Sequence, residues 1–203
     1  NLTILSNLGT AYKELGKTEK AITFYQKVLH INSNHTNANY NLGLVFYKLK
    51  ELKRAKSYLE KTIKIQPNYA MAHFILGNLQ KEFEELKKAK LSYLKAIEIR
   101  PDFAGAHNNL GLLFRELGKL QKSKNSCQKA IQIQPNYAEA HSNLGTTLQE
   151  LGEHQKAILC YQKAIQIDSN CMGAHYNLGN AFKELGEYQK AISWYGKEIE
   201  IHP

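Results

Sequence analysis

The sequence predicts an all-α protein, a solenoid of six helix-turn-helix repeats of 34 residues each. Three observations lead to this fold class. A Leu-Gly pair recurs every 34 residues, each period holds two stretches of helical periodicity, and turn-forming residues separate the stretches. The pairs begin at Leu8, Leu42, Leu76, Leu110, Leu144 and Leu178. Repeats of a solenoid contact only their neighbours, so the fold exposes a long surface instead of a closed catalytic pocket.

The repeats follow one another without a linker and are expected to form one domain, residues 1–203. Their approximate ranges are 2–35, 36–69, 70–103, 104–137, 138–171 and 172–203. We number positions within each repeat from 1 to 34, so that position 1 is Leu2 in the first repeat and Ala138 in the fifth.

The first half of each repeat predicts one helix, helix A. In the fifth repeat, the apolar stripe at helical spacing consists of Ala138, His141, Leu144, Gly145 and Leu148. Gly152 comes next, and glycine accepts the left-handed conformation that ends a helix. Lys50 and Glu84 replace this glycine in repeats 2 and 3, which have drifted furthest from the common pattern.

The second half of each repeat predicts another helix, helix B. Its stripe in the fifth repeat consists of Ala157, Ile158, Tyr161, Ala164, Ile165 and Ile167. The turn-forming run Asp168–Asn170 follows, and a proline stops helix B in other repeats. These prolines are Pro67, Pro101, Pro135 and, at the chain end, Pro203. Twelve helices are therefore expected.

Small residues recur where two helices must approach closely. One is the glycine of each Leu-Gly pair, and another is the alanine at position 20. The position-20 residues are Ala21, Ala55, Ala89, Ser123, Ala157 and Ala191. We expect larger side chains there to overpack the helix pair, at about 1–3 kcal/mol.

This pattern resembles the tetratricopeptide repeat family over all 203 residues. The matching features are the Leu-Gly pairs, the aromatic residues at positions 11 and 24, the alanine at position 20 and the closing proline. The resemblance implies a right-handed superhelix whose concave groove is lined by helices A. At position 4, where the family expects tryptophan, the sequence has His73, His107, His141 and His175. We expect these histidines to pack between helices, because stacked repeats lie too far apart to share a zinc ion.

Asparagine recurs at position 6, a groove-facing position in the family. A similar ladder in the O-GlcNAc transferase superhelix holds the backbone of an extended peptide. A carboxamide suits this task, because it both donates and accepts hydrogen bonds. The alternative is that these asparagines bond to the next repeat. The acidic residue that often accompanies the ladder, at position 2, is missing from most repeats.

The resemblance also implies groove-facing side chains at positions 5, 9 and 12. Aromatic residues there in repeats 2 and 3 could anchor a peptide side chain, or could instead pack on adjacent repeats. The predicted peptide-binding residues are Asn7, Asn41, Asn109, Asn143, Asn177, Tyr40, Leu44, Tyr47, Phe74, Asn78 and Asn180.

Charged residues also follow the repeat. Glutamate at position 13 opposes the helix dipole by about 0.3–1 kcal/mol, so we expect a basic residue of the next repeat to offset it. Lysine or arginine fills positions 19 and 26 of every helix B. We interpret this stripe as a solvated face and predict no nucleic-acid partner, because no aromatic residues are interleaved for base stacking.

The most consistent function is a protein-interaction scaffold that binds an extended peptide in the groove. An alternative is the substrate-recognition arm of a larger enzyme, of glycosyltransferase or sulfotransferase type. Within these residues we predict no catalytic activity, no metal, no cofactor and no membrane contact, in a cytoplasmic protein. End-to-end self-association is also possible, because Glu198 stands where other repeats pack alanine.

Overall fold

The computed structural model describes residues 1–171 and 173–201, which form twelve α-helices. Contacts within the chain group it into two compact units, Asn1–Pro101 and Asp102–Pro203. The first unit contains α1 (Leu2–Glu14), α2 (Thr18–Ile31), α3 (Thr36–Lys48), α4 (Leu52–Ile65), α5 (Ala70–Glu82) and α6 (Leu86–Ile99). The second contains α7 (Ala104–Glu116), α8 (Leu120–Ile133), α9 (Ala138–Glu150), α10 (His154–Ile167), α11 (Ala174–Glu184) and α12 (Tyr188–Ile201). Pro203, predicted to close the last repeat, lies outside the described residues.

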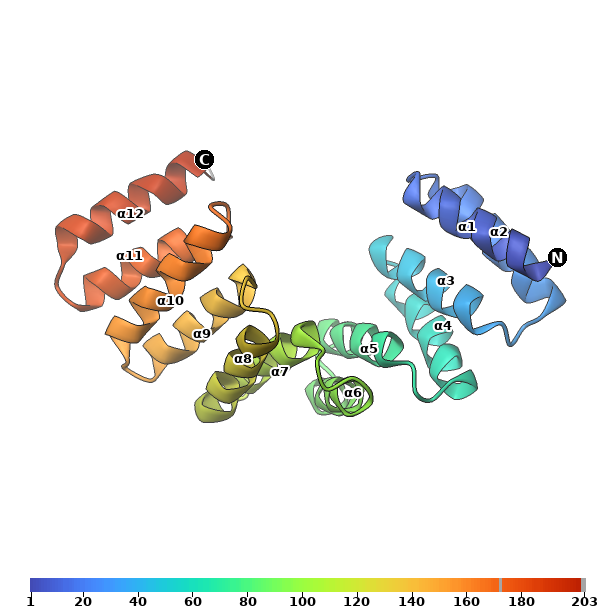
Figure 1. The fold of residues 1–203 in the computed structure, drawn as a ribbon, viewed down its shortest axis with the longest axis horizontal. Helices are drawn as coiled ribbons and strands as arrows, with labels where there is room; N and C mark the ends of the chain where they lie inside the picture. The colour runs from blue at the N-terminus through green and yellow to red at the C-terminus, as the bar shows by residue number, and fades with distance from the viewer. Residues whose placement is uncertain (172, 202–203) are drawn as a thin grey trace. The chain divides into compact units, whose positions relative to one another are not determined.

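Each unit is a stack of three helical hairpins (Figure 1). Every helix A packs on its own helix B, and every helix B packs on helix A of the following repeat in the unit. Successive helices A also contact one another: α1 contacts α3, α3 contacts α5, α7 contacts α9, and α9 contacts α11. The predicted all-α architecture of six two-helix repeats is confirmed.

Glycine at position 8 permits the close approach of helices A and B, as predicted. At Gly145 an added Cβ atom would lie 2.7 Å from Cε1 of Tyr161, at position 24 of the same repeat. The same contact recurs at Gly9, Gly77 and Gly179. Position 20 is also buried in all six repeats, so helix B presents its alanine and its ring together to helix A. The aromatic side chain at position 24, not the alanine, is what the glycine touches.

A residue with positive φ ends each helix A. Gly16, Gly118, Gly152 and Gly186 have φ between 68° and 77°. Lys50 and Glu84, which replace the glycine, adopt the same conformation with φ of 60° and 58°. A side chain in this conformation costs roughly 1–2 kcal/mol. The packing of the repeat therefore dictates the turn even where the sequence does not favour it.

Position 4 connects helix A to the turn that precedes it. His73 and His141 place Nε2 2.9 Å from the carbonyl oxygens of Pro67 and Pro135, six residues earlier. His175 makes the equivalent bond, also at 2.9 Å, and Asn39 replaces the imidazole in repeat 2 with an amide that donates to Ser33 O. The main polar contact of these residues is thus with the turn backbone, whereas the sequence predicted packing between helices.

Candidate functional site

Helices A of each unit form a continuous layer, and we call its outer surface the helix A face. Side chains at positions 9 and 12 of this layer stay partly exposed in the described repeats, whereas position 5 is mostly buried. At position 6 the asparagines are half-buried, except Asn7, which is exposed. Most of the predicted peptide-binding residues therefore lie on one accessible surface within each unit.

The asparagines at position 6 also bond within the protein. Lys13 Nζ donates to Asn41 Oδ1 at 3.1 Å, and Asn41 Nδ2 donates to Asn37 O at 2.9 Å. In the second unit, Asn143 Nδ2 donates to Oδ1 of the fully buried Asn108 at 3.0 Å. Both inter-repeat bonds join a position-6 amide to the preceding repeat. A carboxamide has two hydrogens and two acceptor lone pairs, so these bonds use only part of its capacity.

The one break in the asparagine ladder coincides with a change at position 12 of the preceding repeat. Position 12 of the first repeat is Lys13, which binds Asn41 of the second. Position 12 of the second repeat is Tyr47, and the third repeat has Ile75 at position 6. Ile75 belongs to the core of the first unit, and Tyr47 packs against that core. Tyr47 and Ile75 thus replace the lysine and asparagine of these two positions and both lie at the same core, a double change that is visible in the sequence but was not predicted to be linked.

Position 9 supports the buried tyrosine at position 24. Tyr93 donates its hydroxyl hydrogen to Asn78 Oδ1 at 2.9 Å, and Tyr195 donates to Asn180 Oδ1 at 2.8 Å. In the first repeat, the Tyr25 hydroxyl lies 3.2 Å from the hydroxyl of Thr10. Asn78 and Asn180 therefore each commit an acceptor to their own repeat.

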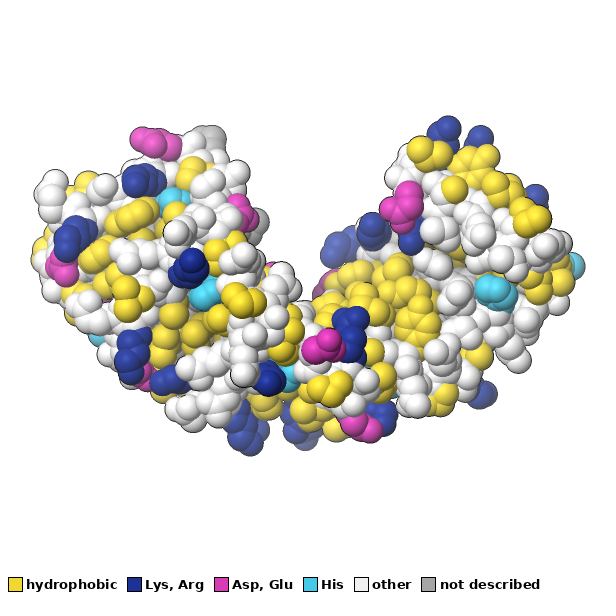
Figure 2. Space-filling view, viewed as in Figure 1, with side chains coloured by type: hydrophobic (Ala, Val, Ile, Leu, Met, Phe, Trp, Pro, Cys, Tyr) yellow, Lys and Arg dark blue, Asp and Glu magenta, His cyan; other side chains and the backbone are white. Residues whose placement is uncertain are grey.

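The aromatic residues of repeats 2 and 3 form an apolar patch on the first unit. Leu44, Tyr47, Met71 and Phe74 are partly exposed and pack against the core, and Figure 2 shows hydrophobic side chains gathered over α3 and α5. Tyr40 is only 9% exposed and stacks on Tyr69 with ring centroids 4.8 Å apart. Tyr40 thus belongs to the core beneath this surface, whereas Leu44, Tyr47, Met71 and Phe74 remain accessible.

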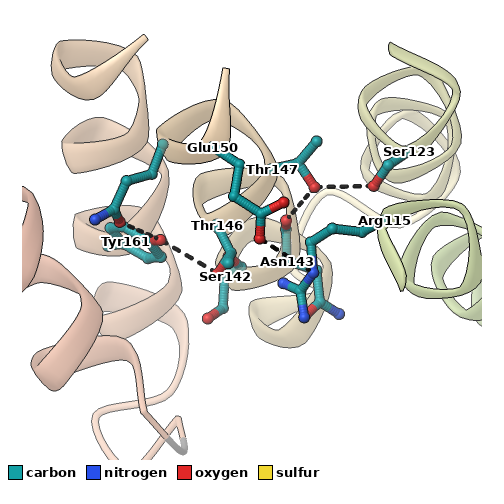
Figure 3. A network of polar contacts seen from close by, with 9 residues as sticks. Arg115, Ser123, Ser142, Asn143, Thr146, Thr147, Glu150 and Tyr161 are labelled. Atoms are coloured by element: carbon teal, nitrogen blue, oxygen red, sulfur yellow. Dashed lines mark hydrogen bonds and ion pairs between the residues drawn. The ribbon is translucent and has the colours of Figure 1, made fainter. Parts of the chain in front are cut away.

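The interior of the second unit contains a network of polar contacts between α8, α9 and α10. Figure 3 shows a chain of hydrogen bonds from Ser123 through Thr147 to the backbone of Asn143, with oxygen separations of 2.9 Å. Tyr161 donates to Gln149 Oε1 at 2.9 Å, and burial raises the pKa of its hydroxyl to about 12. This hydroxyl therefore remains a donor at any physiological pH.

Glutamate at position 13 finds a partner in the preceding repeat, where we had expected the next one. Glu150 Oε1 lies 3.7 Å from Arg115 Nε (Figure 3), and Glu184 Oε2 lies 2.9 Å from His154 Nδ1. Glu82 accepts from the Tyr47 hydroxyl at 2.6 Å. The expectation was wrong in direction because position 13 faces the preceding repeat along the stack, whereas position 12 faces the following one.

The basic stripe on helices B makes contacts within the protein. At position 19, Arg54 Cζ lies 3.6 Å from the centre of the Phe46 ring, and Lys20, Lys122 and Lys190 lie over the aromatic residue at position 11 in the same way. At position 26, Lys95, Lys129 and Lys163 each bond to the side chain three residues later. These contacts favour a structural role for the stripe.

Cysteines and histidines form no metal site in the described part of the chain, where no three potential ligands converge. Burial raises the pKa of Cys127 and Cys160 to about 11, so both thiols stay protonated.

No helix among residues 1–171 and 173–201 combines the length and hydrophobicity needed to cross a membrane. A pocket of about 410 Å³ on the last repeat includes Asn180 and Lys183 in its wall.

Comparison with known proteins agrees with the fold. Profiles described as tetratricopeptide repeat match residues 36–69, 102–170 and 142–203, and a profile described as TPR repeat matches residues 3–50 and 84–118. No curated protein sequence matches the chain.

Several solved structures are similar. MamA is 25% identical with a TM-score of 0.72, over 83% of this chain and 92% of MamA. PilF of Pseudomonas aeruginosa is 20% identical with a TM-score of 0.87, over 100% of this chain and 92% of PilF. YrrB, described as a TPR protein with an unusual peptide-binding site, is 23% identical with a TM-score of 0.70, over 88% of this chain and 92% of YrrB. Such repeats are typically non-catalytic scaffolds, and together the repeat pattern, the paired helices and the profile matches show that this chain belongs to the tetratricopeptide repeat family.

Proposed function

We propose that the chain is a protein-interaction scaffold and that the helix A face binds an extended segment of another protein. The observation that carries the proposal is the partial exposure of hydrogen-bonding side chains at positions 6, 9 and 12 of successive helices A. An extended peptide has unpaired backbone donors and acceptors along its whole length, and carboxamides can satisfy both. YrrB is described as having a peptide-binding site, but at 23% identity it supports only the capacity of the shared fold to bind peptides.

The internal bonds of the asparagines favour this use. Lys13 fixes the amide plane of Asn41, and Asn108 fixes that of Asn143. An amide already held by internal hydrogen bonds loses little further entropy when it binds a peptide through its remaining hydrogen and lone pair. In this proposal Asn7, Asn109 and Asn177 extend the row of backbone contacts, with Asn78 and Asn180 beside them. Leu44, Tyr47 and Phe74 supply apolar contacts, supported from beneath by Tyr40.

The test is a paired substitution that removes two amides of the row. A random library of twelve-residue peptides supplies ligands, and their affinities for the complete chain are measured by fluorescence anisotropy. We expect Asn41→Ala to weaken peptides bound to the first unit and Asn143→Ala to weaken those bound to the second, so the double variant should weaken every selected peptide. Each lost hydrogen bond contributes about 0.5–1.5 kcal/mol, which corresponds to about a twofold to tenfold loss. Asn125→Ala on the exposed side of α8 is the matched control. Unchanged affinity in a double variant with an unchanged melting curve would rule out the ladder.

A further inference from the structure

The net charge of the chain resides entirely in its first unit. Residues 1–101 contain 17 Lys and Arg and 8 Asp and Glu, whereas residues 102–203 contain 10 of each. The first unit therefore carries the whole formal charge of +9, and the second carries none. A field of one sign raises the rate at which oppositely charged partners arrive. The apolar patch over α3 and α5 lies on this same unit.

A local charge reversal stands at the edge of the patch. Position 13 is glutamate in five repeats, Glu14, Glu82, Glu116, Glu150 and Glu184, and lysine only in the second repeat, at Lys48. Lys48 directly follows Tyr47, is exposed, and forms no ion pair with any described residue. Glu82, which contacts the patch through Tyr47, already accepts a hydrogen bond from the Tyr47 hydroxyl at 2.6 Å and lies 3.6 Å from Lys50 Nζ. The patch thus combines apolar side chains with an uncompensated cation.

From this combination we infer that the patch formed by Leu44, Tyr47, Met71 and Phe74 takes an acidic peptide segment, with a bulky apolar side chain on the patch and a carboxylate against Lys48. The inference rests on the proposed function and specifies its ligand. The apolar side chain gains by leaving water, at about 25 cal/mol per Å². The carboxylate adds selectivity, because Lys48 would repel a segment that carries positive charge.

A protein segment fits the patch better than a nucleic acid does. The lysines on helices B that could follow a phosphate backbone already contact aromatic rings and neighbouring side chains. The ring of Tyr47 is itself held, since its hydroxyl binds Glu82 and Lys50 Nζ lies 5.7 Å from its centre. A nucleobase could stack there only beside the carboxylate of Glu82, which repels the phosphates on either side of the base.

The experiment uses four labelled twelve-residue peptides with a Gly-Ser background. One has a central Phe flanked by Glu residues, and the others replace Phe with Ser, Glu with Gln, or Glu with Lys. Anisotropy titrations are run on the complete chain, on Lys48→Glu, which restores the residue type of the other repeats, and on Lys53→Glu. Lys53→Glu is the control, because it changes the net charge by the same amount but at an exposed residue of α4 in the same unit.

We expect the Phe-Glu peptide to bind most tightly, and Lys48→Glu to weaken it about fivefold while Lys53→Glu has less than about a twofold effect. Equal weakening by both variants would assign the preference to the general field of the unit and overturn the inference. Equal binding of the Gln peptide would overturn it as well, yet leave the proposed function standing. Failure of every peptide, including those from the library, would remove both. Tighter binding of a single-stranded oligonucleotide, abolished by Lys48→Glu, would assign the patch to phosphate and overturn the inference.

Discussion

Two glycine-to-alanine substitutions in helix interiors should have opposite effects on stability. Alanine is favoured over glycine in a helix by about 1 kcal/mol. At Gly196, inside α12, an added Cβ would have no described atom within 4 Å. Gly196→Ala should therefore stabilise the chain by this full amount. At Gly145, inside α9, the same Cβ would lie 2.7, 2.8 and 3.0 Å from three ring atoms of Tyr161.

The Tyr161 ring has no easy way to withdraw. It is 0% exposed, and its hydroxyl is held by Gln149 at 2.9 Å and lies 3.2 Å from Thr146 Oγ1. Overpacking of this kind costs about 1–3 kcal/mol. After subtraction of the propensity gain, we expect Gly145→Ala to lose up to about 2 kcal/mol, so the two variants should differ by the overpacking cost of about 1–3 kcal/mol.

Urea unfolding followed by circular dichroism measures the difference, provided that the slope of the transition is the same for both variants. The position of the glycine is the only intended variable, since both substitutions add one methyl group to a helix interior. If both variants were stabilised equally, the ring would have withdrawn without cost, and the reasoning from the close contact would be refuted.

Three further outcomes are expected. Lys50→Gly should stabilise the chain by about 1 kcal/mol in urea unfolding, because it relieves a side chain at positive φ of 60°; a loss of stability would contradict the account of the turn. Bonds from Lys124 and Lys156 lower the pKa of Glu153 below its usual 4.5, so the stability from this carboxylate is present above pH 4.5 and is lost as the pH falls through the lowered value. Lys124→Met should make unfolding less acid-sensitive between pH 6 and pH 3, and an unchanged pH profile would show that the pair contributes nothing. His141→Ala should destabilise the chain by about 1 kcal/mol through loss of the bond to Pro135 O, and His141→Asn should lose less, as judged by melting temperature, because Asn39 makes the equivalent bond in repeat 2.

The local structure followed closely from residue type. The Leu-Gly period, the helical stripes and the prolines predicted the repeats and their helices, because each is a constraint within one or two helices. Lys50 and Glu84 are instructive, since both depart from the pattern and yet adopt the glycine conformation. The glycine signal is absent at both positions, and the packing of the helix pair imposes the turn conformation there.

The candidate site was harder to predict, because its contacts cross between repeats. Groove positions could be assigned from the resemblance, but the burial of Tyr40 under its neighbours and the partners of Asn41 and Asn143 could not. A side chain at position 12 reaches position 6 of the next repeat, a separation of 28 residues between Lys13 and Asn41. Sequence periodicity shows that both positions recur, but not that they meet.

The sequence by itself determined the repeat, the twelve helices, the left-handed turns and the positions that must stay small, since these depend on backbone conformation and on the volume between two adjacent helices. Only the tertiary structure decided which neighbour each polar side chain contacts. It directed the position-4 histidines to the preceding turn, the position-13 glutamates to the preceding repeat and the lysines of helices B to nearby rings. The lysine contacts depend on the direction in which a side chain leaves its helix within one repeat. The histidine and glutamate contacts depend on the neighbour that stacking brings close, which no single repeat contains.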